Sequence, residues 1–168
     1  MNESKDLKRT QEFVTKLKST NSTNDKIDII KEYNDDYIIK QVLKYTYSPF
    51  KQFHLTSATV KKNKKLEPRE GYNDLFYLLD ALTKRTITGH EAIQSVKGYI
   101  QHMEEWQQDL VFCILDKNLK TRTGADLINK AIPGCVPTFK VALANSYDKQ
   151  KGKVNFDTQK WFASHKLD

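Results

Sequence analysis

The end of the chain carries a lysine whose setting favours nucleophilic chemistry. An apolar run that starts at Trp161 leads to Lys166, and Asp168 follows two positions later. A lysine at the end of a short, half-apolar strand can be partly desolvated, which lowers the pKa of its ammonium group. Because the neutral amine is the nucleophilic form, Lys166 is the candidate for covalent chemistry.

Two segments combine basic residues, threonine and glycine just before a predicted helix. The first holds Lys84, Arg85, Thr86, Thr88 and Gly89, and the second holds Lys117, Lys120, Thr121, Arg122, Thr123 and Gly124. Backbone amides and the helix dipole favour a phosphate at a helix N-terminus. Both segments, with Lys130 in the second helix, are therefore candidate phosphate contacts. The alternative is ordinary capping, in which basic residues end one helix and threonine begins the next.

Other groupings of polar residues do not predict a catalytic or metal site. The histidines are scattered without zinc-ligand spacing, at positions 54, 90, 102 and 165. Glycine-rich phosphate loops of the Walker or Rossmann type are absent. The pairs Asp35-Asp36 and Glu104-Glu105 are adjacent in sequence. Adjacent helical residues do not share a face, so paired acid–base work is not expected.

Hydrophobic periodicity predicts that helices position these residues. Apolar side chains recur at helical spacing over 7–17, 27–30, 38–43, 75–82, 92–100, 106–114 and 127–132. Asn73 is predicted to cap the helix over 75–82. Thr88 and Glu91 are predicted to form a capping box before the next helix. The helix that contains 38–43 should end before Pro49, because proline disfavours helix at the preceding residue.

The segment from Lys51 to Glu70 lacks this periodicity and is predicted to be an exposed basic loop. It contains six basic residues against two acidic ones. A merely solvated surface loop and a loop that contacts nucleic acid are equally compatible with this composition. The nearby aromatic residues Tyr45, Tyr47, Phe50 and Phe53 are expected to pack between helices rather than to stack on a nucleic acid.

The pattern changes after Pro137. Phe139, Val141 and Leu143 alternate as in an extended strand, and the run from Trp161 has strand-like composition again. We therefore place a domain boundary near Phe139, which gives a helical domain over 1–138 and a segment over 139–168. The second segment is too short to be a domain and is expected to begin one that is otherwise missing.

Composition narrows the class of partner. The 168 residues suit about one domain, and the net charge of +7 with a pI of about 9.2 favours a polyanionic partner such as nucleic acid. The alternative is a soluble domain with surplus surface lysine. Cys113 and Cys135 lack metal-ligand spacing and indicate a reducing, intracellular setting. Neither a signal peptide nor a membrane-spanning stretch is expected.

The order of these segments resembles ATP-dependent DNA ligases, with the T-even bacteriophage type as the nearest match. The stretches that carry the resemblance are 39–49, 73–100 and 114–168, including the run Thr83-Lys84-Arg85-Thr86-Ile87-Thr88-Gly89 and the final Lys166-Leu167-Asp168. The resemblance implies an all-α, multi-helix DNA-binding domain of DNA-ligase type over 1–138. It also implies that the extended, β-like segment over 139–168 is the truncated start of the adenylation (nucleotidyltransferase) domain.

The resemblance also implies a role for the terminal lysine. In this family a lysine amine attacks the α-phosphate of ATP, AMP passes to the 5′-phosphate of a nick, and the 3′-hydroxyl displaces it. Lys166 aligns with that lysine and Asp168 with the acid of the same motif. The glycine and basic residue that normally continue the motif are missing. We expect ATP and Mg²⁺ in the complete enzyme, no cofactor in this fragment, and no adenylation or sealing by it.

The expected partner is double-stranded DNA that carries a nick, bound without base readout and with a steep dependence on salt. The chain is expected to be a cytoplasmic monomer that does not contact membranes, encoded by a phage or prophage in a bacterial host. Two alternatives remain open. One is a standalone, non-catalytic protein that binds DNA nicks or ends, and the other is a helical protein–protein adaptor whose lysines only maintain solubility.

Overall fold

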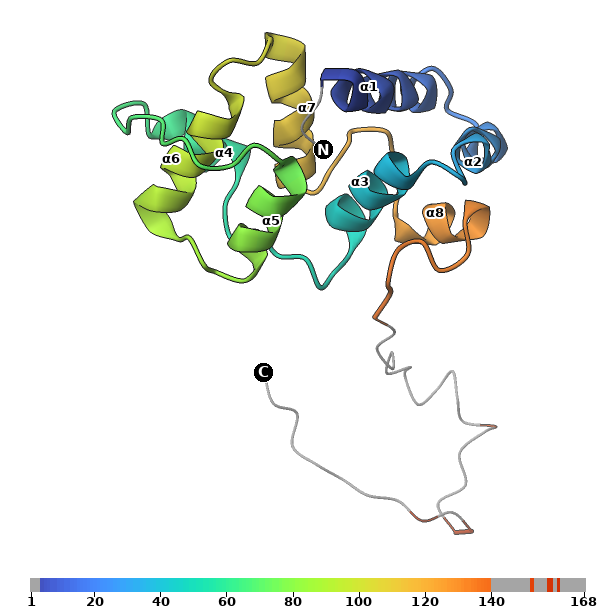
Figure 1. Cartoon of the computed structure of the whole chain (residues 1–168). Coiled ribbons are helices and arrows are strands. Elements are labelled where there is room, and N and C mark those ends of the chain that lie inside the picture. The colour runs from blue at the N-terminus through green and yellow to red at the C-terminus, as the bar shows by residue number, and fades with distance from the viewer. Residues whose placement is uncertain (1–3, 140–151, 153–156, 159, 161–168) are drawn as a thin grey trace. The chain divides into compact units, whose positions relative to one another are not determined.

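The computed structural model describes residues 4–139, 152, 157, 158 and 160, and within them it contains helices and no strand (Figure 1). The helices are α1 (Ser4–Lys18), α2 (Thr23–Glu32), α3 (Tyr37–Tyr47), α4 (Ser57–Lys62), α5 (Leu75–Thr83), α6 (Gly89–Ile100), α7 (Glu105–Leu115) and α8 (Ala125–Ala131). The all-α prediction is therefore confirmed for the described residues.

The helices form two groups that share α7. On one side α1 packs against α2 and α3, and α2 packs against α8. On the other side α6 packs against α4 and α5. Because α7 contacts α1 and α3 as well as α4 and α6, it joins the two groups into one core (Figure 1).

The core follows the periodicity of the sequence. Leu7, Phe13, Val14 and Leu17 on α1 are at most 2% exposed, as the spacing predicts. The apolar residues at helical spacing on α3, α5, α6 and α7 are buried in the same cluster. Burial of each such side chain contributes about 1.5–3 kcal/mol, so this face of each helix fixes its orientation.

The prediction of an exposed basic loop from Lys51 to Glu70 is wrong in part. This segment contains the short helix α4, and Phe53, Leu55 and Val60 are buried in the core. Thr56 caps the helix by accepting a hydrogen bond from the Thr59 amide. Exposed lysines dominate the composition of this segment, so its few apolar residues give no periodic pattern in the sequence.

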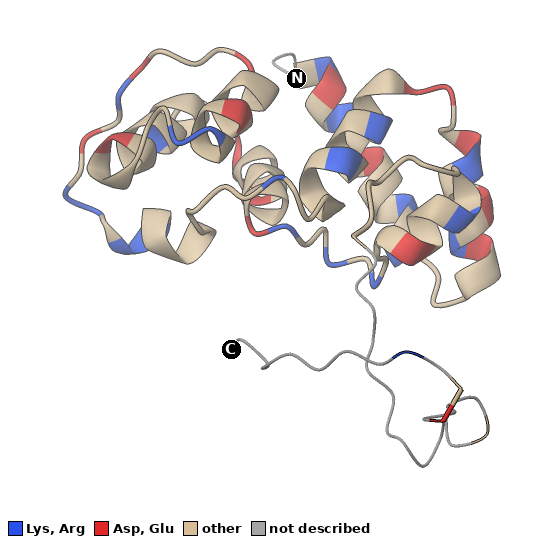
Figure 2. Ribbon diagram, turned by 90° about the horizontal axis from the view of Figure 1, so that it is seen from below, with Lys and Arg blue, Asp and Glu red and all other residues tan. Residues whose placement is uncertain are grey.

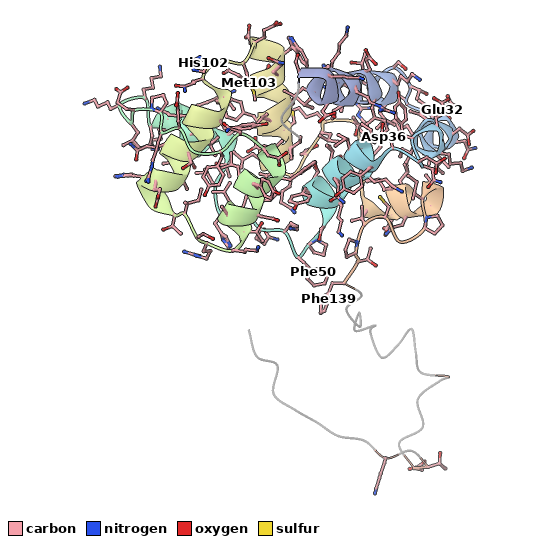
Figure 3. All side chains as sticks on the ribbon, viewed as in Figure 1. Glu32, Asp36, Phe50, His102, Met103 and Phe139 are labelled. Carbon is pink, nitrogen blue, oxygen red and sulfur yellow. The ribbon has the colours of Figure 1, made fainter. Side chains whose placement is uncertain are left out.

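The aromatic residues near this segment differ in how far they are buried. Tyr45 and Phe53 are buried, as expected, and Tyr47 is half-buried. Phe50 is 61% exposed, and its side chain points away from the helices (Figure 3). Core packing thus accounts for Tyr45 and Phe53 but not for Phe50.

Two predicted helix caps differ in the structure. The N-cap of α5 is Asp74 rather than Asn73, and its carboxylate accepts hydrogen bonds from the amides of Phe76 and Tyr77. Thr88 is the N-cap residue of α6, but its side chain makes no capping hydrogen bond, so the predicted capping box is wrong. Glu91 instead pairs with Arg69, with 2.6 Å between Oε1 and Nη1.

The chain divides into two units, Met1–Thr138 and Phe139–Asp168. The extended strands predicted after Pro137 and from Trp161 onward lie outside the described residues, apart from Phe139. Among the residues that the structure describes, no helix has both the length and the apolar character needed to cross a bilayer.

Candidate nucleic-acid interface

The first candidate segment begins where α5 ends. The Arg85 amide donates to the Leu82 carbonyl at 3.1 Å, and the Thr86 amide donates to the Ala81 carbonyl at 2.9 Å. This pair of bonds is the Schellman motif, with Arg85 in the left-handed conformation at φ +56°. Glycine is usual at that position, because it carries no side chain to clash with the backbone.

The second candidate segment begins with the same motif at the end of α7. The Lys117 amide donates to the Ile114 carbonyl at 3.0 Å, and the Asn118 amide donates to the Cys113 carbonyl at 2.9 Å. Lys117 occupies the left-handed position at φ +58°. The two loops therefore leave their helices by the same backbone path, with a basic residue at the position where glycine is most common.

The described non-glycine residues in the left-handed conformation are all basic residue types. The positive-φ non-glycine residues in the described part of the chain are five in number: His54, Arg85, Lys117, Lys120 and Arg122. Each costs about 1–3 kcal/mol relative to a relaxed backbone. Such strain clusters at functional sites, and here it falls on four of the residues that the sequence predicts as phosphate contacts.

Lys117 differs from the others because its ammonium group is turned inward. Nζ donates to the carbonyls of Ser48 and Lys51, at 2.6 Å each, and lies 5.4 Å from the centre of the Phe53 ring. Burial lowers the pKa of Lys117 below its ordinary value. Lys117 thus fastens the α7–α8 loop to the α3–α4 connection.

The α3–α4 connection, residues 48–56, links the two candidate loops. Its Lys51 ammonium pairs with the Asp80 carboxylate on α5 and lies 4.1 Å from the centre of the Tyr45 ring. The Tyr45 hydroxyl donates to the same carboxylate at 2.9 Å. Burial opposes the charge on Asp80, but the hydrogen bonds from Lys51 and Tyr45 hold its pKa below the usual value.

The α5–α6 loop opens into a small hollow at the start of α6. Arg85, Thr88 and Gly89 line it together with His54 from the α3–α4 connection, and its volume is about 160 Å³. Lys84, Arg85, Thr86, Thr88 and Gly89 are all exposed. Because no side chain caps the first turn of α6, its amides remain available to an incoming acceptor.

The α7–α8 loop alternates exposed cations with anchored residues. Lys120 and Arg122 are exposed, whereas Leu119 and Thr121 are at most 2% exposed. The hydroxyls of Thr121 and Thr123 lie 2.6 Å apart. This alternation holds Lys120 and Arg122 on the outside of the loop.

Other predicted residues of this segment lie around α8. Thr123 also contacts the Tyr47 hydroxyl at 3.3 Å, so its side chain is engaged within the protein. Gly124 is the N-cap of α8, which is only seven residues long, and Lys130 is exposed on that helix. Lysine and arginine residues, in blue, occur along the connections between helices as well as on the helices themselves (Figure 2).

Sequence reasoning missed three basic groups of this region. His54 reaches the hollow at α6 from a segment that has no periodic pattern. Lys18 and Lys26 line a pocket with Lys120 and Arg122, although they lie on α1 and α2. Lys26 is buried on the apolar face of a short helix, and only a tertiary contact distinguishes it from a surface lysine.

The predicted nucleophile Lys166 and the acid Asp168 lie outside the described residues. Both assignments stay predictions, and so do the DNA-contact assignments of the two loops.

Comparison with known proteins identifies relatives of the chain. No family model matches it. The DNA ligases of Enterobacteria phage T4 and Enterobacteria phage T6 are each 27% identical to it over 145 residues. That match covers 82% of this chain and 29% of the ligase, so the chain spans less than a third of the length of these relatives.

Solved structures share the fold. The structure titled "Pmar-Lig_PreS3" superposes with a TM-score of 0.66 at 21% identity, covering 86% of this chain and 35% of that one. The structure titled "Pmar-Lig_Pre." gives a TM-score of 0.64 with the same identity and coverage. The predicted resemblance to DNA ligases of T-even bacteriophages is thus confirmed, and the chain is similar to part of the T4 and T6 enzymes.

Proposed function

We propose that the helical part of this chain is the DNA-binding domain of an ATP-dependent DNA ligase and grips duplex DNA near a nick. Similarity to the T4 and T6 ligases over most of the chain supports a ligase-related role. The observation that carries the binding role is the pair of loops that begin with the same Schellman motif and present exposed cations.

The geometry supports a grip on the phosphate backbone. Arg85 and the free amides of α6 form one contact region, and Lys120 with Arg122 forms a second. Lys117 and Lys51 hold the α3–α4 connection between the regions, so the loops belong to one framework. Contacts of this kind position a protein on DNA without reading its sequence.

The catalytic part of the proposal rests on the resemblance alone. Lys166 is proposed as the AMP-accepting lysine and Asp168 as the acid of the same motif. ATP and Mg²⁺ belong to the complete enzyme. We propose that the 168 residues bind DNA without sealing it. Attack by a lysine requires ATP to be held in position and a metal ion to offset the charge on its phosphates.

The test is binding of this chain to nicked and intact duplexes of one sequence across a series of salt concentrations. We expect tight binding at low salt, a steep loss of affinity as salt rises, and a preference for the nicked duplex. A parallel incubation of the nicked duplex with ATP and Mg²⁺ should yield no sealed product.

Matched variants separate loop contacts from general positive charge. Lys120→Asn with Arg122→Asn removes two charges at left-handed positions that asparagine tolerates. Lys5→Ala with Lys8→Ala removes two charges from exposed positions near the start of α1. Equal losses in both variants would reduce the proposal to non-specific attraction, and no binding at low salt would overturn it.

A further inference from the structure

A pocket between the α1–α2 turn and the α7–α8 loop gathers four cations and no acid. It is lined by Lys18, Lys26, Lys120 and Arg122 together with Leu17, Thr20, Asn21 and Thr121. These residues come from α1, the α1–α2 turn, α2 and the α7–α8 loop. The charge is therefore assembled by the tertiary fold and is not a run in the sequence.

Lys26 is the distinctive member of this set. It is only 4% exposed, and its ammonium donates to the Thr121 carbonyl at 2.7 Å. An ammonium group has three donors, and within the described residues this carbonyl is the one hydrogen-bond acceptor it contacts. A buried cation without an opposite charge is costly, and an anion in the pocket would remove that cost.

Arg122 is held in the pocket by a contact within the protein. Arg122 donates to the Asn21 side-chain oxygen at 3.2 Å, which holds the guanidinium at the pocket. Lys120 and Arg122 both adopt positive φ. Asp25, the acidic residue next to Lys26 in the sequence, is exposed and accepts from the Thr20 hydroxyl at 2.9 Å. This carboxylate is thus engaged by Thr20 and does not line the pocket.

The volume restricts the ligand to a small anion. The pocket measures about 200 Å³, below the roughly 300–1,000 Å³ typical of pockets that enclose whole organic ligands. A phosphate group with a few waters fits this space, since a water occupies about 30 Å³ of liquid. Its several oxygens can accept from Lys26, Arg122 and Lys18 at once.

We infer that this pocket, centred on Lys26, is a binding site for one phosphate group. In the setting of the proposed function, on which this part rests, the group is a phosphodiester of the DNA held by the α7–α8 loop. The same chemistry would accept free inorganic phosphate, so the experiment has one arm for each source.

The experiment follows backbone amide signals of the whole chain by NMR. One arm adds inorganic phosphate against chloride at equal ionic strength, and the other adds a short nicked duplex. We expect saturable shifts at Asn21, Thr121 and Arg122 in both arms. Lys26→Met should abolish the phosphate response, weaken duplex binding about tenfold and reduce the salt slope by about one.

A second pair of variants keeps the test valid if Lys26→Met does not fold. Lys18→Ala removes an exposed cation of the pocket, whereas Lys8→Ala removes one from the same helix about 15 Å away along its axis. We expect Lys18→Ala to weaken the phosphate response several-fold and Lys8→Ala to leave it unchanged. Circular dichroism is the control that each variant is folded.

The outcomes separate the pocket from the proposed function. Pocket shifts with phosphate but not with duplex would support the site and overturn DNA as the source. Absence of saturable phosphate shifts, or shifts that Lys26→Met and Lys18→Ala leave intact, would overturn the site even if the duplex binds elsewhere. Failure of the duplex to bind at low salt would contradict the proposed function. The phosphate arm alone would then test whether the pocket binds a phosphate group.

Discussion

The α5–α6 and α7–α8 loops begin with the same backbone motif but use its basic residue in opposite ways. Arg85 and Lys117 both occupy the left-handed position of a Schellman motif. Arg85 is exposed at the hollow in front of α6. Lys117 turns inward and donates to two carbonyls of the α3–α4 connection.

The difference shows that position in a motif does not decide whether a cation is available to a ligand. Lys117 has acceptors within reach because residues 48–51 pass beside the end of α7. The α7–α8 loop carries two further cations, Lys120 and Arg122, three and five residues after Lys117. We therefore propose that Lys117 acts in stability and that Arg85, Lys120 and Arg122 contact phosphates.

The largest expected effect is that of Lys117→Met on stability. The change removes both charged hydrogen bonds and leaves the Lys51 carbonyl without this donor, while the Ser48 carbonyl keeps the bond from the Lys51 amide. This loss should cost about 2–3 kcal/mol of unfolding free energy. Chemical denaturation measures this loss, with Lys64→Met at an exposed position as the control. Equal stability of the two variants would contradict the inward role of Lys117.

Lys120→Asn with Arg122→Asn should have the next largest effect, and on binding rather than stability. Each phosphate contact contributes up to about tenfold in affinity near 0.1 M salt, so we expect a loss of about thirtyfold and a salt slope lower by about two. Fluorescence anisotropy with a labelled duplex measures both quantities. An unchanged slope would show that these side chains do not contact phosphates.

Asp80→Asn should weaken the link between α5 and the α3–α4 connection in a pH-dependent way. The folded pKa of Asp80 lies below its ordinary value of 3.8, so its charge stabilises the fold above that pH and loses this effect as acid titrates the folded carboxylate. We expect a cost of about 1 kcal/mol at pH 7 that shrinks below pH 4. Thermal melts of both proteins from pH 7 to pH 3 give the difference, and a constant or widening gap would refute the assignment.

The smallest expected effect is that of Arg85→Gly, and it separates stability from binding. Glycine relieves the left-handed strain, so stability should rise by about 0.5–1 kcal/mol while duplex binding falls several-fold. Paired melts and binding titrations of this single variant measure both changes. Loss of stability would mean that the Arg85 side chain supports the loop.

Much of the helical framework is predictable from the sequence, because amphipathic spacing reports which face of a helix is buried. The apolar positions of α1, α3, α5, α6 and α7 follow that rule. The short helix α4 does not, because its six residues carry one buried residue, Val60, followed by exposed lysines. Its anchors Phe53 and Leu55 lie in the preceding non-helical segment.

The candidate interface is predictable only in outline. Clusters of lysine, arginine and threonine before helices point to the two loops, but the inward turn of Lys117 depends on carbonyls from residues 48–51. The capping box at Thr88 fails because Arg69, from the α4–α5 connection, takes the Glu91 carboxylate. Lys26 joins the pocket only through the tertiary approach of α2 and the α7–α8 loop.

The most direct test of the DNA grip is the salt slope of nicked-duplex binding for the wild type and for Arg85→Asn, Lys120→Asn and Arg122→Asn combined. Asparagine tolerates the left-handed backbone at all three sites, so the fold should persist while the cations are lost. The account predicts a slope lower by about three in the combined variant. An unchanged slope in a folded variant would contradict it.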